Sequence, residues 1–197
     1  NVIKGAARFT SRSEVTVGEH RIQAKQFVIA TGSRATVPPI PGIDETDYLS
    51  NETLFDNTVL PDHLIIIGAG PIGMEMAQAH RRLGAKVTVL ERIRALPNDD
   101  PDLTAIVVNT LVNEGITIRE EVGVASVSGK TGDIRITLKD GEEVCGSHLL
   151  MATGRAPSVT DLGLGEAGIK YSRSGLEVDS RLRTTNKRVF AIGDAKG

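Results

Sequence analysis

The sequence is poor in aromatic residues and in cysteine. Phe, Trp and Tyr make up 3% of its 197 residues, and tryptophan is absent. A hydrophobic core must therefore be mostly aliphatic. The single cysteine, Cys145, excludes an internal disulfide, a Cys-x-x-Cys redox pair and a cysteine zinc cluster. Because Cys145 ends a predicted strand, we expect its thiol to be packed or idle.

Long apolar runs and an excess of one charge are also missing. No run approaches the roughly 18 apolar residues of a membrane helix, and no signal peptide is visible, so we expect a cytoplasmic protein without a membrane segment. The net charge of -2, with basic residues scattered among acids, gives no reason to expect nucleic acid. No metal site is expected, because the histidines lie far apart and lack ligand spacing. They are His20, His63, His80 and His148.

One stretch of the chain has the pattern of a dinucleotide-binding turn. An apolar run at residues 63–67 leads directly into Gly-x-Gly-x-x-Gly and then into a helical pattern. The first glycine permits a tight turn, the second lets a diphosphate approach the backbone, and the third lets the helix pack closely on the strand. The helix N-terminus adds free N–H groups and a positive dipole end. The motif consists of Gly68, Ala69, Gly70, Pro71, Ile72 and Gly73.

The residues around this motif support the interpretation. Apolar positions spaced by three and four over 72–83 predict an amphipathic helix, which Gly84 closes. A second strand follows over 86–90 and ends at Glu91, 18 residues after Gly73. A dinucleotide fold has its ribose-binding acid at this position. The alternative is a glycine-rich turn in an ordinary α/β domain. That alternative does not explain why a carboxylate, Glu91, stands at the end of the second strand.

A second helix and an antiparallel meander are predicted further along. Asp100 is placed as an N-cap, Pro101 occupies the first helical position, and Gly115 ends the helix. The dipeptide Asp140-Gly141 predicts a type I′ hairpin turn. Strands are expected at 116–118, parallel to the first two, and at 122–128, 133–139 and 142–146, antiparallel to one another.

The flanking segments point to one domain that is interrupted by another. Residues 1–32 alternate as short strands, and the prolines of 36–42 predict a crossover between domains. Ala-Thr-Gly ends a strand at 30–32 and again at 152–154, as expected where the chain leaves and re-enters a domain. A last buried strand at 189–194 ends in Asp194. We predict segments at 1–32, 33–155 and 156–197, the middle one an α/β Rossmann-type domain.

Together these motifs resemble the FAD-dependent pyridine nucleotide-disulfide oxidoreductases, which include dihydrolipoamide dehydrogenase, glutathione reductase and mercuric-reductase-like proteins. The matching stretches are Ala30 to Ser33, Gly68 to Gly73 with Glu75 and Glu91, Ala152 to Pro157, and Ala191 to Asp194. The resemblance implies an NAD(P)-binding domain, with a parallel sheet, helices and a meander, inserted between fragments of an FAD-binding domain. It also implies hydride transfer from NAD(P)H to FAD and on to a disulfide or similar acceptor.

The resemblance implies a set of NAD(P)H contacts. The turn from Gly68 to Gly73 holds the pyrophosphate, Glu91 takes the adenosine ribose, and Val122 lies near the adenine. Glu75, one turn into the helix, faces the nicotinamide and the flavin, and Gly154 lines the nicotinamide side. The alternative for Glu75 is a polar residue on the exposed side of its helix.

The FAD contacts implied by the resemblance are Thr31, Gly32 and Asp194, and Asp194 accepts hydrogen bonds from the ribityl chain. The family's first glycine fingerprint and Cys-x4-Cys pair are expected before this sequence, and its dimerisation domain with a His-Glu pair after it. The chain is therefore expected to be an internal piece of a homodimeric parent enzyme, without catalytic residues of its own. Arg155 is either an ion-pair partner or a cofactor contact.

The choice of coenzyme depends on Glu91 and its neighbours. A carboxylate accepts a hydrogen bond from the ribose 2′-OH and repels a 2′-phosphate, which favours NADH. Arg92 and Arg94 follow closely and could bind that phosphate instead. The sequence thus favours NADH only slightly.

Two other functions stay open. The chain could act as a nucleotide-binding module without catalysis, or its parent could be a flavin reductase or oxidase that never used a disulfide. A visible flavin spectrum would indicate an assembled redox centre, and a colourless protein would indicate a binding module. A Cys-x4-Cys pair upstream would support the disulfide enzyme, and its absence would support the flavin reductase or oxidase.

Overall fold

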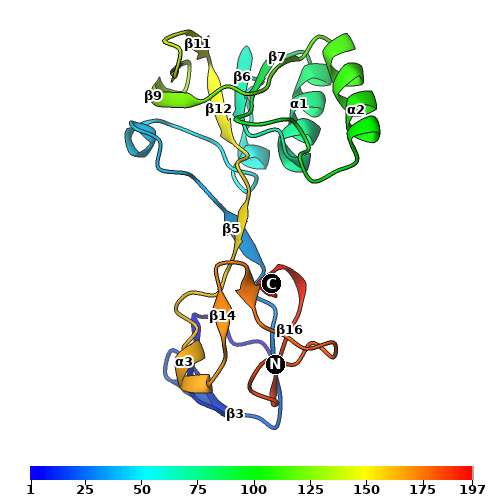
Figure 1. Cartoon of the computed structure of the whole chain (residues 1–197). Helices are drawn as coiled ribbons and strands as arrows, with labels where there is room; N and C mark the ends of the chain where they lie inside the picture. Colours follow the sequence, from blue (N-terminus) through cyan, green and yellow to red (C-terminus); the bar gives the residue numbers. More distant parts are fainter. Residues whose placement is uncertain (197) are drawn as a thin grey trace. The chain divides into compact units, whose positions relative to one another are not determined.

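The computed structural model describes residues 1–196 and divides the chain into two compact units (Figure 1). The central unit comprises residues 35–154, and the split unit comprises residues 1–34 together with those from 155 onward. The predicted middle segment, 33–155, differs from the central unit by two residues at one end and one at the other. Among the described residues, no helix has both the length and the apolar character to cross a bilayer.

The central unit is built on a four-stranded parallel sheet with the order β12-β6-β7-β8. The helices α1 and α2 both lie on one side of it (Figure 1). The α/β class, with a parallel sheet, helices and a separate antiparallel meander, is therefore confirmed. The elements are β6 (His63–Ile67), α1 (Pro71–Leu83), β7 (Lys86–Leu90), α2 (Pro101–Asn113), β8 (Thr117–Arg119) and β12 (His148–Met151).

Strand β6 is buried on both faces. Leu64 and Ile66 belong to a cluster that includes Met74 of α1 and Leu111 of α2. The alternate residues of the strand, Ile65 and Ile67, belong to a second cluster, with the meander. This explains why β6 is a continuous apolar run, since a strand covered on both sides has no polar face.

The meander consists of β9 (Val124–Lys130), β10 (Asp133–Leu138) and β11 (Glu143–Gly146). The predicted type I′ turn between the last two is wrong. Gly141 has φ 91°, but Asp140 does not have the positive φ that type I′ requires. The Gly141 N–H donates to the Leu138 carbonyl at 3.0 Å, so the loop has three residues, with glycine in the left-handed position.

Two connections of the central unit contain only short 3-10 turns. One of these turns is η2 (Leu54–Asp56), which precedes β6. The proline-rich crossover contains no strand after residue 35 and ends in another such turn, η1 (Ile43–Glu45). Three prolines in this stretch remove backbone donors, which accounts for the absence of a strand.

The split unit has its own core. Phe9 and Phe27 meet edge to face at 5.2 Å between ring centroids, and Val189 and Leu176 are fully buried beside them. The first three strands form an antiparallel sheet, and β16 pairs in parallel with β4. The elements are β1 (Ala7–Ser11), β2 (Glu14–Val17), β3 (His20–Gln23), β4 (Phe27–Ile29), α3 (Leu164–Ala167), β14 (Tyr171–Ser172), β15 (Gly175–Leu176), β16 (Val189–Ala191) and η3 (Gly193–Ala195).

The strands of the split unit are short. Although alternation begins near residue 1, the first strand begins at Ala7, and Val2 is exposed. The strand β15 has only two residues, Gly175 and Leu176. Apolar alternation marks the buried positions, but the strand continues only where a neighbour pairs with it. The remaining pair, β5 (Ser33–Ala35) and β13 (Arg155–Pro157), joins the two Ala-Thr-Gly crossings.

Two half-buried histidines lie at the beginning of the parallel sheet. The His63 Nε2 is 2.9 Å from the Thr88 hydroxyl, and the His148 Nδ1 is 3.0 Å from the Ser147 hydroxyl. Burial lowers the pKa of both imidazoles, and the charge of Lys86 adds to this at His63. Protonation of both rings is therefore less favourable in the folded state than in the unfolded chain.

These histidines should make stability depend on pH. Their folded pKa values lie below the unfolded value of about 6.5, so the unfolded chain binds more protons in that range. The free energy of urea unfolding should be constant above about pH 7.5 and should fall as the pH drops below about 6.5. His63→Gln should flatten this dependence. His20→Gln, at an exposed site on β3, is the control and should not change it.

Candidate functional site

The glycine turn between β6 and α1 has two glycines that the fold itself requires. Gly68 has φ 110°, and a Cβ there would overlap the Ala152 carbonyl oxygen. A Cβ on Gly73 would overlap the carbonyl oxygen of Gly68. The first glycine therefore permits the tight turn, and the third lets α1 pack closely on β6, as predicted.

Gly70 differs from both of its neighbours in the motif. It has φ -75°, which any residue can adopt, and a Cβ there would meet no protein atom within 4 Å. Neither backbone conformation nor packing requires glycine at this position. A requirement for glycine at residue 70 would have to come from a molecule that approaches the backbone from outside.

The beginning of α1 offers several unpaired N–H groups. Those of Gly70, Ile72 and Gly73 donate to no other residue within 1–196, and Pro71 at the first helical position has no N–H. The N–H of Ala69 is already taken, because it donates to Glu91 Oε2 at 2.8 Å. An anion at this helix end would therefore meet three backbone donors and the positive end of the dipole.

Glu91 is held in place by backbone donors on both of its oxygens. Besides the bond from Ala69, its Oε1 accepts from the Ile93 N–H at 3.1 Å. The Glu91 carbonyl accepts from the Val122 N–H at 2.9 Å, so these two predicted residues are neighbours. The carboxylate thus lies at the end of β7, beside the glycine turn, with its orientation fixed.

The two arginines after Glu91 differ in their contacts. Arg94 donates to the Pro97 carbonyl at 2.7 Å and so belongs to its own loop. Arg92 is exposed and has neither a hydrogen bond nor an ion pair with any residue in the described range. Of the two, Arg92 is therefore the one whose guanidinium is available to an anionic ligand.

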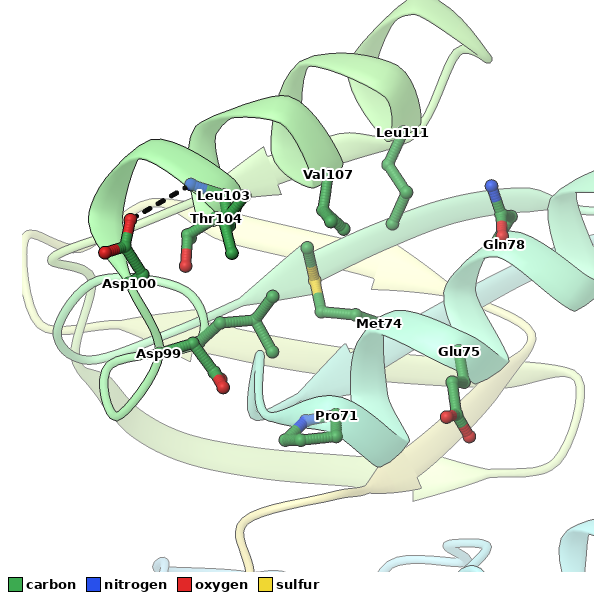
Figure 2. A pocket seen from close by; sticks show the side chains of 11 residues that line it. Pro71, Met74, Glu75, Gln78, Asp99, Asp100, Leu103, Thr104, Val107 and Leu111 are labelled. Atoms are coloured by element: carbon green, nitrogen blue, oxygen red, sulfur yellow. Dashed lines mark hydrogen bonds between the residues drawn. The ribbon is translucent and has the colours of Figure 1, made fainter.

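A groove of about 400 Å³ lies between α1 and α2, beside the glycine turn (Figure 2). Pro71 and Met74 line it from α1, and Met74 is directed towards α2. Glu75 is exposed and points away from α2 in this view. Asp100 caps α2 as predicted, because its side chain accepts from the N–H groups of Asp102 and Leu103. Within residues 1–196, no group of three or more His, Cys, Asp or Glu side chains is arranged to hold a metal ion.

The split unit brings the other predicted residues together. The Thr31 hydroxyl donates to the Ser158 carbonyl at 2.7 Å, and the Gly32 carbonyl accepts from the Ser158 N–H at 2.9 Å. Asp194 lies in η3, where its Oδ2 accepts from the Ser33 hydroxyl at 2.6 Å. Sequence reasoning gave Ser33 no role and left Arg155 open. Their contact joins residues 122 positions apart, which no local pattern reveals.

Comparison with known proteins places the chain in a family. The family described as pyridine nucleotide-disulphide oxidoreductase matches residues 1–197. This chain belongs to that family. Mercuric reductases of Bacillus cereus and Streptomyces lividans are 37% and 38% identical over 98% of the chain, which spans 31% and 43% of their lengths. The resemblance drawn from the motifs is confirmed.

A solved structure of another flavoprotein agrees with the fold. The HOCl-induced flavoprotein disulfide reductase RclA from Escherichia coli superposes with a TM-score of 0.94 and is 33% identical. The superposition covers the whole chain and 46% of RclA. The chain thus spans less than half the length of these members of the pyridine nucleotide-disulphide oxidoreductase family.

The three glycines should respond differently to substitution. Gly73→Ala and Gly68→Ala should lower the free energy of unfolding by about 2 kcal/mol or more, because each Cβ would overlap a carbonyl oxygen. Gly70→Ala should cost no more than about 1 kcal/mol, the usual cost of alanine at a helix N-cap. Urea unfolding followed by circular dichroism measures all three. Equal losses at the three positions would contradict these separate roles.

Proposed function

We propose that this chain is the NAD(P)H-binding part of a flavoprotein oxidoreductase, flanked by segments of its FAD-binding domain. The observation that carries the proposal is Gly70. It is a glycine that the fold does not require, and it stands in a turn with three unpaired N–H groups. A diphosphate fits this turn, because it needs close approach to the backbone and donors at a helix N-terminus.

The proposal assigns each residue of the central unit a role in binding. Gly70, Ile72 and Gly73 donate backbone hydrogen bonds to the diphosphate, whereas the Ala69 N–H holds Glu91. Glu91 accepts from the adenosine ribose, and Val122 lies beside the adenine. Glu75 and Gly154 flank the nicotinamide end. A side chain at Gly154 would meet no protein atom within 4 Å, but its φ of 126° by itself favours glycine, so Gly70 remains the position that carries the proposal.

In the split unit, Thr31, Gly32 and Asp194 are proposed to contact FAD. These residues would hold FAD, which would supply the chemistry for hydride acceptance from NAD(P)H and for electron transfer to a disulfide or similar acceptor. The residues of this chain bind and orient the two cofactors. The relatives' names, mercuric reductase and flavoprotein disulfide reductase, support a redox enzyme as the parent. The homodimeric parent and the cytoplasmic location stay predictions.

A slight preference for NADH is part of the proposal. Both oxygens of Glu91 accept backbone N–H bonds, so the carboxylate is not free to turn away from a 2′-phosphate. Arg94 is bonded within its own loop, which leaves Arg92 as the cation nearest in sequence to offset this repulsion. A fixed carboxylate beside one free guanidinium favours NADH, but less than a carboxylate alone would.

Gly70→Val should abolish NADH binding. A branched side chain would occupy the space that the diphosphate needs, and the open surroundings of Gly70 let the variant fold. Isothermal titration calorimetry should show a loss of at least about 100-fold in affinity, or roughly 2.7 kcal/mol. Unchanged NADH affinity in a folded variant would contradict the assignment of the glycine turn as the diphosphate site. The matched control is Gly165→Val in α3 of the split unit, where glycine also has open surroundings and no left-handed φ, and this variant should bind NADH normally.

Glu91→Ala, with Arg92 retained, should weaken NADH binding relative to NADPH. The substitution removes the ribose acceptor and the repulsion of a 2′-phosphate while it keeps the free guanidinium. The ratio of the two dissociation constants should shift towards NADPH by about tenfold, or 1.4 kcal/mol. Adding Arg92→Ala should reverse part of the shift. A stronger preference for NADH in the single variant would contradict the role of Glu91.

A further inference from the structure

The hydroxyl of Ser33 lies between a guanidinium and a carboxylate in the split unit. Arg155 Nε donates to the Ser33 Oγ at 2.6 Å, and Arg155 Nη2 donates to the Ser33 carbonyl at 2.6 Å. The same Oγ is 2.6 Å from Asp194 Oδ2. The three residues come from β13, β5 and η3, which are remote in sequence.

The direction of these hydrogen bonds follows from the chemistry of the groups. An arginine can only donate, so the Ser33 oxygen accepts from Arg155 and its single proton is directed at Asp194. A bond from a hydroxyl to a carboxylate is charge-assisted and therefore strong. Asp194 Oδ2 is thus engaged, whereas Oδ1 accepts from no residue within 1–196.

Arg155 does not act on Asp194 directly. Its Nε is 3.9 Å from Asp194 Oδ2, too long for a hydrogen bond, and 65% of the Asp194 side chain is exposed. An exposed pair at that distance contributes little. Elsewhere in the split unit, Arg183 contacts Asp179 directly at 2.8 Å and lowers the pKa of that carboxyl to about 2. The guanidinium of Arg155 instead donates hydrogen bonds to both oxygens of Ser33.

We infer that Arg155 is a positioning residue, which orients the Asp194 carboxylate through the Ser33 hydroxyl so that Oδ1 stays available to a polyhydroxylated ligand. This inference rests on the proposed function, where that ligand is the ribityl chain of FAD. Arg155 fixes Ser33, Ser33 holds one carboxylate oxygen, and the other oxygen accepts from the ligand hydroxyl. Neither Arg155 nor Ser33 needs to touch the flavin.

Riboflavin and lumiflavin test this inference, because they share the isoalloxazine ring and only riboflavin carries the ribityl chain. The quenching of flavin fluorescence gives both dissociation constants for the 197-residue chain. The wild type should bind riboflavin more tightly than lumiflavin. Ser33→Ala and Arg155→Lys should each weaken riboflavin binding by about tenfold and leave lumiflavin binding unchanged, so that the ratio of the two constants approaches one.

Further variants separate positioning from general structure. The double variant should be no weaker than either single one, because both act on the same carboxylate. Ser33→Thr keeps the hydroxyl and should retain most of the wild-type ratio. Arg34→Lys is the matched control, since Arg34 donates to Thr160 instead and should not affect either flavin.

Three results would overturn the inference. They are equal binding of the two flavins by the wild type, additive losses in the double variant, or equal losses for both flavins in Ser33→Ala. Absence of binding of either flavin by the wild type would overturn it as well. Titration of the same samples with NADH tests the proposed function independently of this inference. The glycine turn lies in the central unit and does not include Ser33, Arg155 or Asp194, so NADH binding should be the same in all variants.

Discussion

The close approach of α1 to β6 is the constraint on which the central unit depends. The helix can approach the strand because Gly73 brings no Cβ against the Gly68 carbonyl oxygen, and Gly68 in turn brings none against the Ala152 carbonyl oxygen that follows β12. That approach places the first turn of α1 beside the end of β7. The carboxylate of Glu91 can then reach the Ala69 N–H at 2.8 Å. The position of the acid relative to the helix end is thus a result of backbone packing.

The two proposed cofactor sites use opposite chemistry. The central unit offers backbone N–H groups at a helix end, a donor surface suited to a diphosphate. The split unit offers a carboxylate oxygen held in place by a serine, an acceptor suited to a hydroxyl. The glycine turn is formed by residues adjacent in the chain. The serine-held carboxylate instead depends on segments that come together only when the split unit folds.

This difference explains what could be predicted from the sequence. The roles of Gly68 and Gly73, the N-cap Asp100 and the burial of β6 follow from local patterns, and the structure agrees with each of them. The turn type predicted at Asp140 was wrong, although the hairpin is present, because Asp-Gly suits two kinds of turn and the pairing of the strands decides between them. The second backbone bond to Glu91 depends on the path of the loop through Ile93. The contact between Arg155 and Ser33 depends on long-range folding.

The burial of β6 on both faces has a consequence for how the protein can change. Residues at even positions of the strand contact the helices, and those at odd positions contact the meander. Substitutions in the meander core can therefore be absorbed on one side of the sheet, while the layer that supports the glycine turn keeps its packing. The strand thus separates the core of the central unit into two layers, one with the helices and one with the meander.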